Sequence, residues 1–205
     1  MKDLKIEEYF TTGIEMAKAN YWLIFGNFLI TCVLCFLAGM TIIGILIIPA
    51  LLAGYYKFLL RAARGEKVEF MDSWSSGFQD GLWWKSLLLM FLSALGILVG
   101  FILLVIPGIY LATAWLLAWF LLVDRDMLPT EALGKSRELV HEMGFWKVFG
   151  VYILLTIGLQ IISVIPVVNI LLLFAYPFVM MVYVALYENA INNDSPLPLE
   201  GGIGE

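Results

Sequence analysis

The chain has 205 residues, of which 62% are hydrophobic and 14% charged, and its mean hydropathy is +0.93. A soluble domain is roughly half apolar and about a quarter charged, so this composition indicates an integral membrane protein. The net charge of −5 comes without a dense Lys/Arg cluster, which excludes a nucleic-acid-binding surface.

The chain opens with a mixed polar and apolar segment, residues 1–20. Its apolar side chains recur on one helical face, so we expect an amphipathic helix that lies in the headgroup plane or caps the cytoplasmic end of the bundle. Two apolar runs follow, at about 21–40 and 42–60, and each is long enough to cross the hydrocarbon core at about 1.5 Å per residue. Cys32 and Cys35 lie inside the first run. We interpret them as small apolar helix residues rather than as a redox or metal pair.

The next polar segment, residues 70–82, also carries apolar side chains at helical spacing, which predicts a second amphipathic helix. The apolar runs at about 86–104 and 107–123 follow it. Within the first of them, Gly96 and Gly100 have the small-x-x-x-small spacing that allows close helix contact. We expect that contact to form within the chain rather than between copies.

A third amphipathic helix is predicted to begin at Pro129 and to end at Gly144, because Pro favours a helix start and Gly a helix end. The last apolar runs lie at about 147–165 and 167–187. The acidic tail, 192–205, is rich in Pro and Gly, and we expect it to be disordered.

These three parts are interpreted as copies of one unit. An aromatic doublet ending in Trp precedes each apolar pair, at Trp22, Trp84 and Trp146, 62 residues apart both times. Recurrence of a whole unit at a fixed period is typical of an internal repeat. We therefore predict an all-α membrane protein with six transmembrane helices: three tandem repeats of an interfacial amphipathic helix plus a helical hairpin, with approximate threefold pseudo-symmetry. One polytopic membrane domain covers residues 1–191, with units at about 1–66, 67–126 and 127–191.

Charge placement predicts the orientation of these units. All 12 Lys and Arg residues lie in or beside the segments 1–20, 57–85 and 124–147, whereas the turns inside the apolar pairs carry no charged residue. An excess of Lys and Arg marks cytoplasmic loops, and units with an even number of spans insert the same way up. We expect the chain to lie in the cytoplasmic (inner) membrane of a bacterium or archaeon, with both termini cytoplasmic.

Candidate binding residues are the cations expected at headgroup depth, where each contributes about 1 kcal/mol to attraction by anionic lipid. The Trp of each doublet is expected to anchor the following span at the membrane surface. The headgroup-binding set is Lys57, Arg61, Arg64, Lys85, Arg125, Lys135, Arg137 and Lys147, and the anchors are Trp22, Trp84 and Trp146.

The apolar runs contain no Asp, Glu, His or Arg, and ion-coupled transporters usually need such a group in the membrane. Gln160 and Asn169 are the larger polar side chains in these runs and would line a polar path. Asp124 and Asp126 resemble a metal-holding acid pair, but a local ion pair at the end of a span is the favoured interpretation. His141 is the only histidine, and no Ser-His-Asp or Cys-His catalytic pairing is evident around it. We expect no enzymatic activity, no cofactor and no bound metal.

Four stretches carry a family resemblance: I-P-G-I-Y-L-A at 106–112, F-L-L-V-D at 120–124, E-A-L-G-K-S-R-E-L at 131–139 and G-F-W-K-V-F at 144–149. Their order resembles the bacterial membrane family called domain of unknown function 975. It is also similar to the membrane domain fused to some glycerophosphodiester phosphodiesterases, over roughly residues 75–190. The resemblance implies a polytopic helical domain. It implies no hydrolase activity, because this chain lacks the soluble phosphodiesterase barrel.

Two function classes are the main candidates, and a lipid-processing enzyme that uses Asp124 and Asp126 is a third. The leading hypothesis is a non-enzymatic envelope scaffold that binds membrane lipids, or a protein partner on its cytoplasmic face. The alternative is a passive channel or small-solute transporter, with a path through one chain or through a homo-oligomer. Nucleic acid is not an expected partner of either.

Overall fold

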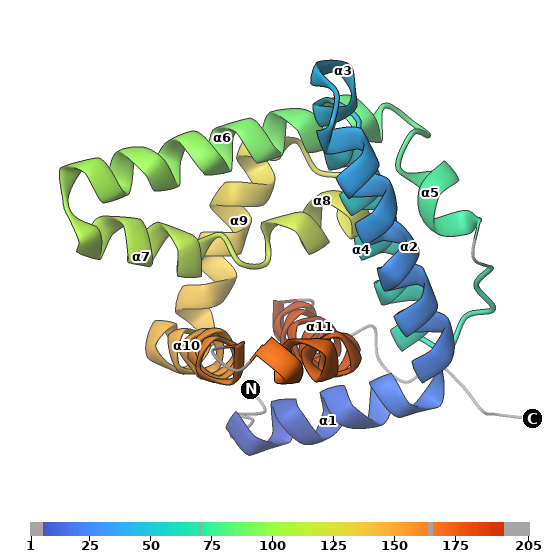
Figure 1. The fold of residues 1–205 in the computed structure, drawn as a ribbon. Helices are drawn as coiled ribbons and strands as arrows, with labels where there is room; N and C mark the ends of the chain where they lie inside the picture. The colour runs from blue at the N-terminus through green and yellow to red at the C-terminus, as the bar shows by residue number, and fades with distance from the viewer. Residues whose placement is uncertain (1–5, 70, 164–165, 195–205) are drawn as a thin grey trace, which may run out of the picture.

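The computed structural model describes the backbone of residues 6–69, 71–163 and 166–194, and their side chains except those of 42–43, 72, 161–172 and 193–194. Within these ranges all regular secondary structure is helical (Figure 1). The helices are α1 (Ile6–Ala19), α2 (Tyr21–Gly39), α3 (Ile42–Ile45), α4 (Ile48–Ala63), α5 (Asp72–Ser76), α6 (Leu82–Leu103), α7 (Val105–Ala114), α8 (Ala118–Arg125), α9 (Pro129–Glu142), α10 (Phe145–Ser163) and α11 (Pro166–Asp194).

Four helical stretches in the described part of the chain are long and apolar enough to cross a membrane: Tyr21–Gly39, Leu82–Leu103, Val105–Arg125 and Leu173–Asn192. A fifth is added if α9 and α10, which meet at a bend of 102°, count as one broken span. Helix α4 has only 16 residues, fewer than the roughly 20 that a span normally needs. The structure therefore agrees with an all-helical membrane protein, whereas the predicted six spans are not confirmed.

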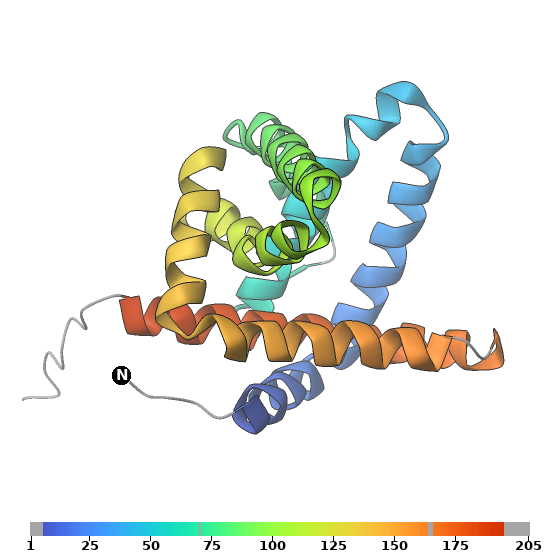
Figure 2. The same cartoon turned by 90° about the vertical axis from the view of Figure 1, so that its left-hand side faces the viewer.

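The apolar helices pack as three pairs that point in different directions. Helices α6 and α7 lie lengthwise in Figure 1, where α10 and α11 are seen end-on, and Figure 2 reverses this relation. Helices α2 and α4 stand upright in both views. Because the pairs diverge, much of their apolar surface stays uncovered, including Ile102, Leu103 and Ile106 at the far end of α6 and α7. The predicted repeat is not confirmed by this arrangement.

The core lies where α4, α8 and α11 meet. Leu59, Leu122 and Met181, one from each of these helices, are all 0% exposed. Phe120 of α8 stacks on Tyr187 of α11, with ring centroids 5.2 Å apart. Helices α4, α8 and α11 thus share one buried centre.

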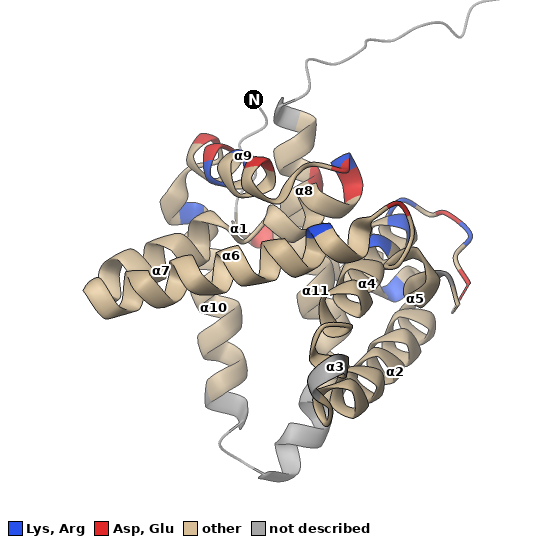
Figure 3. Ribbon diagram, turned by 90° about the horizontal axis from the view of Figure 1, so that it is seen from above, with Lys and Arg blue, Asp and Glu red and all other residues tan. Residues whose placement is uncertain are grey.

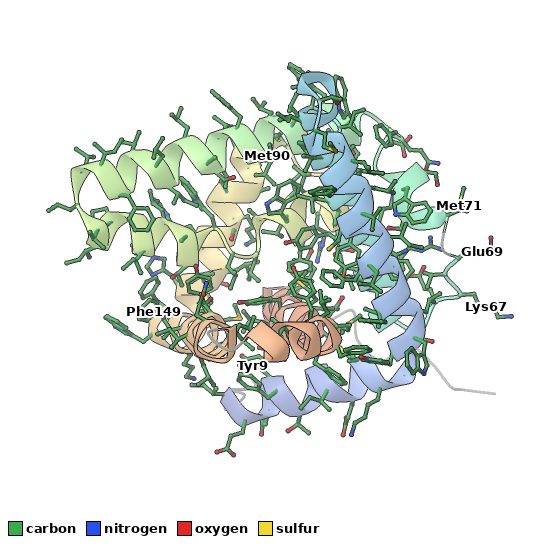
Figure 4. The ribbon with its side chains drawn as sticks, viewed as in Figure 1. Tyr9, Lys67, Glu69, Met71, Met90 and Phe149 are labelled. Carbon is green, nitrogen blue, oxygen red and sulfur yellow. The ribbon has the colours of Figure 1, made fainter. Side chains whose placement is uncertain are left out.

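Helix α1 packs across α11 and confirms the first predicted amphipathic helix. Its buried residues are Tyr9, Gly13 and Ala17, and a Cβ added to Gly13 would lie 2.7 Å from the backbone of Val182. The Tyr9 hydroxyl, labelled in Figure 4, donates a hydrogen bond to Asn189 Oδ1 at 3.2 Å. This helix therefore packs across the side of α11, and its position relative to the membrane stays a prediction.

The second predicted amphipathic helix is much shorter than expected. Only Asp72–Ser76 is helical within 71–81, and α6 begins at Leu82. Gly77 sits so close to α4 that a Cβ would overlap the carbonyl oxygen of Ala50, and Gly81 has a left-handed backbone with φ 71°. Glycine permits both features, so the helix ends although the apolar periodicity continues.

The third amphipathic helix, α9, is confirmed with its predicted limits. Pro129 stands at its start, and the Glu131 side chain accepts a hydrogen bond from the Leu128 N–H at 3.1 Å. Gly144 has φ 91°, a left-handed conformation that is strained for other residues. This glycine lets the chain turn by 102° into α10.

Helices α6 and α7 form a hairpin that reverses at a single extended residue, Leu104. A Cβ added to Gly100 would lie 2.9 Å from the Cα of Gly108, and one added to Gly96 would overlap the ring of Trp115. The Gly96–Gly100 spacing therefore serves contact within the chain, as predicted.

A buried polar network fastens α5 to α2. The Ser73 hydroxyl donates to Asn27 Oδ1 at 2.9 Å, and Trp74 Nε1 donates to Thr31 Oγ1 at 3.4 Å. Asn27 and Ser73 are both 0% exposed. Gly54 of α4 meets the same segment, since a Cβ there would overlap the Ser73 carbonyl oxygen. Polar residues inside the first apolar run thus act as interhelical hydrogen-bonding groups.

Candidate lipid-binding surface

The charged side chains gather on one part of the molecule. Figure 3 shows Lys, Arg, Asp and Glu over α8, α9 and the connector between α4 and α5, whereas α3, α7 and the far end of α6 carry none. This separation follows from the sequence, because residues 86–123 contain no charged residue. A protein whose charged residues lie on one part of its surface, while its apolar helix ends carry no charge, is suited to crossing a membrane.

Arg64, one of the predicted headgroup-binding cations, ties three helices together. It follows α4 and donates to both carboxylate oxygens of Asp124 in α8, at 2.5 and 3.0 Å, and to Glu188 of α11 at 2.8 Å. Asp124 also accepts a hydrogen bond from the Tyr187 hydroxyl at 2.9 Å. The hydrogen bonds that Arg64 donates to Asp124 raise the pKa of Arg64 above its usual value, and the nearby Glu188 charge adds to the increase. We call these four residues the Arg64 bridge.

Other predicted cations also pair with acids of the chain. Lys85 Nζ lies 2.7 Å from Asp126 Oδ1, and Arg125 lies 3.9 Å from Asp124. Arg61 pairs with Glu66 at 2.8 Å and Lys135 with Glu138 at 3.3 Å. The two acids of the Asp124–Asp126 segment thus each contact a cation, in agreement with the ion-pair interpretation.

The remaining cations of the predicted set are Lys57, Arg137 and Lys147. Lys57 is half-buried on α4, Arg137 is exposed on α9, and Lys147 is half-buried in the first turn of α10. Arg137 and Lys147 flank the corner where α9 turns into α10. Of the predicted cations, Arg64 and Lys85 thus join different helices, and contact of the set with lipid stays a prediction.

An apolar groove of about 560 Å³ lies beside that corner, between α7, α9 and α10. Phe149, labelled in Figure 4, belongs to the α10 wall of this groove. The lining residues are Ile106, Ile109, Tyr110, His141, Phe145, Trp146 and Phe149. We call it the α7–α10 groove.

The α7–α10 groove has one polar edge. The Tyr110 hydroxyl lies 2.8 Å from His141 Nε2, a hydrogen bond in which the imidazole tautomer decides which group donates. Phe145 packs on both rings, with centroids 5.3 Å from Tyr110 and 6.0 Å from His141. The groove therefore offers apolar walls for a hydrocarbon chain and a polar pair at its edge.

The predicted Trp anchors are all exposed. Trp22, Trp84 and Trp146 lie in the first turns of α2, α6 and α10 and are 74%, 59% and 77% exposed. Exposed indoles at helix starts are suited to the membrane interface. Trp146 also lines the α7–α10 groove, which places one anchor next to the candidate site.

The predicted polar path is not tested by these contacts. Gln160 is exposed on α10. Asn169 belongs to α11, but its side chain lies outside the described residues. The channel alternative stays a prediction.

Sequence reasoning missed both the Arg64 bridge and the Tyr110–His141 pair. Arg64 and Asp124 are 60 residues apart, and Tyr110 and His141 are 31 apart. His141 is exposed, and its imidazole nevertheless forms a hydrogen bond with Tyr110. No local pattern marks pairs that form only when distant helices meet.

Neither a protein-family model, nor a curated protein, nor a solved structure matches this chain. The resemblance to domain of unknown function 975 therefore stays a prediction, and the site rests on its own geometry.

Proposed function

We propose that this chain is an integral protein of a bacterial or archaeal cytoplasmic membrane that acts as a non-enzymatic, lipid-binding envelope scaffold. Both termini and the charged connectors face the cytoplasm, and the chain inserts as three tandem units of two spans. Protein partners would meet the cytoplasmic helices.

The observation that carries this proposal is the α7–α10 groove. A phospholipid chain fits between its apolar walls, with the headgroup at the Tyr110–His141 edge. Arg137 precedes His141 by one helical turn, and Lys147 follows Trp146. Each cation contributes about 1 kcal/mol to attraction by an anionic headgroup, so we expect anionic phospholipid to be preferred.

The Arg64 bridge supports a scaffold rather than a catalytic centre. Its carboxylates already accept hydrogen bonds from Arg64 and Tyr187. Groups that satisfy one another in this way hold α4, α8 and α11 together. Breaking such a bridge is expected to loosen the protein rather than to abolish a reaction.

Native mass spectrometry of the purified protein tests the proposal, using phosphatidylglycerol and phosphatidylcholine with the same acyl chains. We expect phosphatidylglycerol to be retained preferentially. Ile109→Trp, which fills the groove, should reduce its retention. Leu98→Trp, at an exposed position of α6 outside the groove, is the matched control and should leave retention unchanged.

Equal retention of the two lipids by the unaltered protein would contradict the preference for anionic lipid. Retention that Ile109→Trp and Leu98→Trp affect equally would contradict the assignment to the groove. Solute flux through proteoliposomes, absent from protein-free liposomes, would favour the channel alternative instead.

A further inference from the structure

A second, smaller cavity lies among α2, α4 and α11 and shares no lining residue with the α7–α10 groove. Its volume is about 140 Å³. Three sulfur-containing side chains line it: Cys32 and Cys35 from α2 and Met180 from α11. Both cysteines are free thiols. The cavity thus collects the Cys-x-x-Cys motif, which the proposed function does not use, with a thioether from a different helix.

The spacing of the thiols suits one shared ligand. Residues at i and i+3 of a helix lie on the same face, with Cβ atoms about 5–6 Å apart. Cys32 and Cys35 both reach the same cavity wall, and Met180 closes it from α11 while being only 5% exposed. A small ion held between α2 and α11 would therefore meet three sulfur atoms.

The cavity also contains an unpartnered polar group. Tyr55 lines it and is 3% exposed, and its hydroxyl has no hydrogen-bond partner in the described part of the chain. A buried hydroxyl without a partner is unfavourable by about 1–3 kcal/mol. A thiolate in the cavity would accept a hydrogen bond from this hydroxyl.

Ligand chemistry selects the ion. Thiolates and thioethers favour soft cations such as Cu(I), whereas structural Zn(II) sites almost always take four ligands. Among the described residues, His, Cys, Asp and Glu do not gather in threes at any point, so a harder ion finds no comparable site. One Cu(I) and one thiolate are together neutral, so a single thiol proton released to solvent avoids a buried net charge.

We propose that this cavity binds one Cu(I) ion through Cys32, Cys35 and Met180, with the Tyr55 hydroxyl donating a hydrogen bond to a bound thiolate. This site is independent of lipid binding in the α7–α10 groove.

Anaerobic titration of the detergent-purified full chain with Cu(I), against a competing Cu(I) chelator, tests the site. We expect one Cu(I) per chain, lost in Cys32→Ser and in Cys35→Ser. Met180→Leu should weaken binding, and Tyr55→Phe should weaken it about tenfold, as for outer ligand partners. Met90→Leu changes a methionine on α6 outside the cavity, labelled in Figure 4, and should bind as the unaltered protein does.

Far-UV circular dichroism of each variant separates loss of the ligand from loss of the fold. If Cys32→Ser does not fold, the same titration is made with Cys32→Ala and with the milder change Tyr55→Phe. No retention of Cu(I) by the folded, unaltered protein would overturn the proposal. Retention of Cu(I) by Cys32→Ser and Cys35→Ser at the level of the unaltered protein, or Zn(II) retained in preference to Cu(I), would overturn it as well.

Discussion

The α6–α7 hairpin and the α2–α4–α5 region are both built from apolar helices, but they are held together by different contacts. In the hairpin, Gly100 meets Gly108 backbone to backbone, and the far end exposes Ile102 and Ile106. In the α2–α4–α5 region, Asn27 accepts a hydrogen bond in a network that is closed to solvent. The first contact depends on the absence of side chains, the second on polar side chains.

This difference reflects the physics of helix association in lipid. Apolar side chains gain little by leaving lipid for another helix, so close backbone packing and interhelical hydrogen bonds have to provide the attraction. The chain uses close packing alone where its helices are connected by a single-residue turn. It adds hydrogen bonds where α5, a five-residue helix, has to be fixed against two others.

The largest effect is expected for Gly54→Ala, in the α2–α4–α5 region. The new Cβ would overlap the Ser73 carbonyl oxygen, and backbone on both sides leaves no side chain that can move away. Overpacking of this kind costs about 3 kcal/mol. Unfolding in detergent by SDS titration, followed by far-UV circular dichroism, measures the loss. Gly39→Ala, where nothing lies within 4 Å of the Cβ, should change stability by less than about 0.5 kcal/mol.

A smaller loss, about 2 kcal/mol, is expected for Gly100→Ala in the hairpin. Its Cβ would lie 2.9 Å from the Gly108 Cα, so α6 and α7 have to separate slightly. Gly158→Ala in α10 meets nothing within 4 Å and is the matched control for the same SDS titration. Equal stability of the two variants would show that close packing does not hold the hairpin.

The smallest effect belongs to the polar network. Asn27→Leu removes the acceptor of the Ser73 hydroxyl, and interhelical hydrogen bonds in membrane proteins contribute about 1 kcal/mol. Hydrogen exchange followed by mass spectrometry should show faster exchange over Asp72–Ser76. The hairpin peptides, 82–114, serve as the internal control and should exchange at an unchanged rate. Unchanged exchange at α5 would mean that Gly54 packing alone fixes it.

Local patterns predicted much of the helix layout. The apolar face of α1 and the Pro129 and Gly144 signals of α9 gave helices that the structure contains. The Gly96–Gly100 spacing correctly predicted contact within the chain. These features succeed because each depends on residues that are neighbours along one helix or across one short turn.

Patterns failed where a distant segment decides the local structure. Periodicity predicted a helix across 70–82, but Gly77 packs against α4 and the helix stops at Ser76. The lengths of the apolar runs alone predicted six spans. The run at 42–60 is long enough to cross the membrane, but a turn divides it between Ile45, where α3 ends, and Ile48, where α4 begins. The Arg64 bridge and the α7–α10 groove need the relative directions of the helix pairs, which hydropathy does not carry.

The central claim is that the charged segments 57–85 and 124–147 lie on one side of the membrane, and that the turns after α2 and α6 lie on the other side. Cysteine-accessibility labelling in cells tests it most directly, in a background with Cys32→Ala and Cys35→Ala. We predict that Gly134→Cys on α9 reacts with a membrane-impermeant maleimide only after the cytoplasm is opened. Met40→Cys and Leu104→Cys, at the exposed turns after α2 and α6, should react in intact cells. Labelling of all three from the same side would contradict the account.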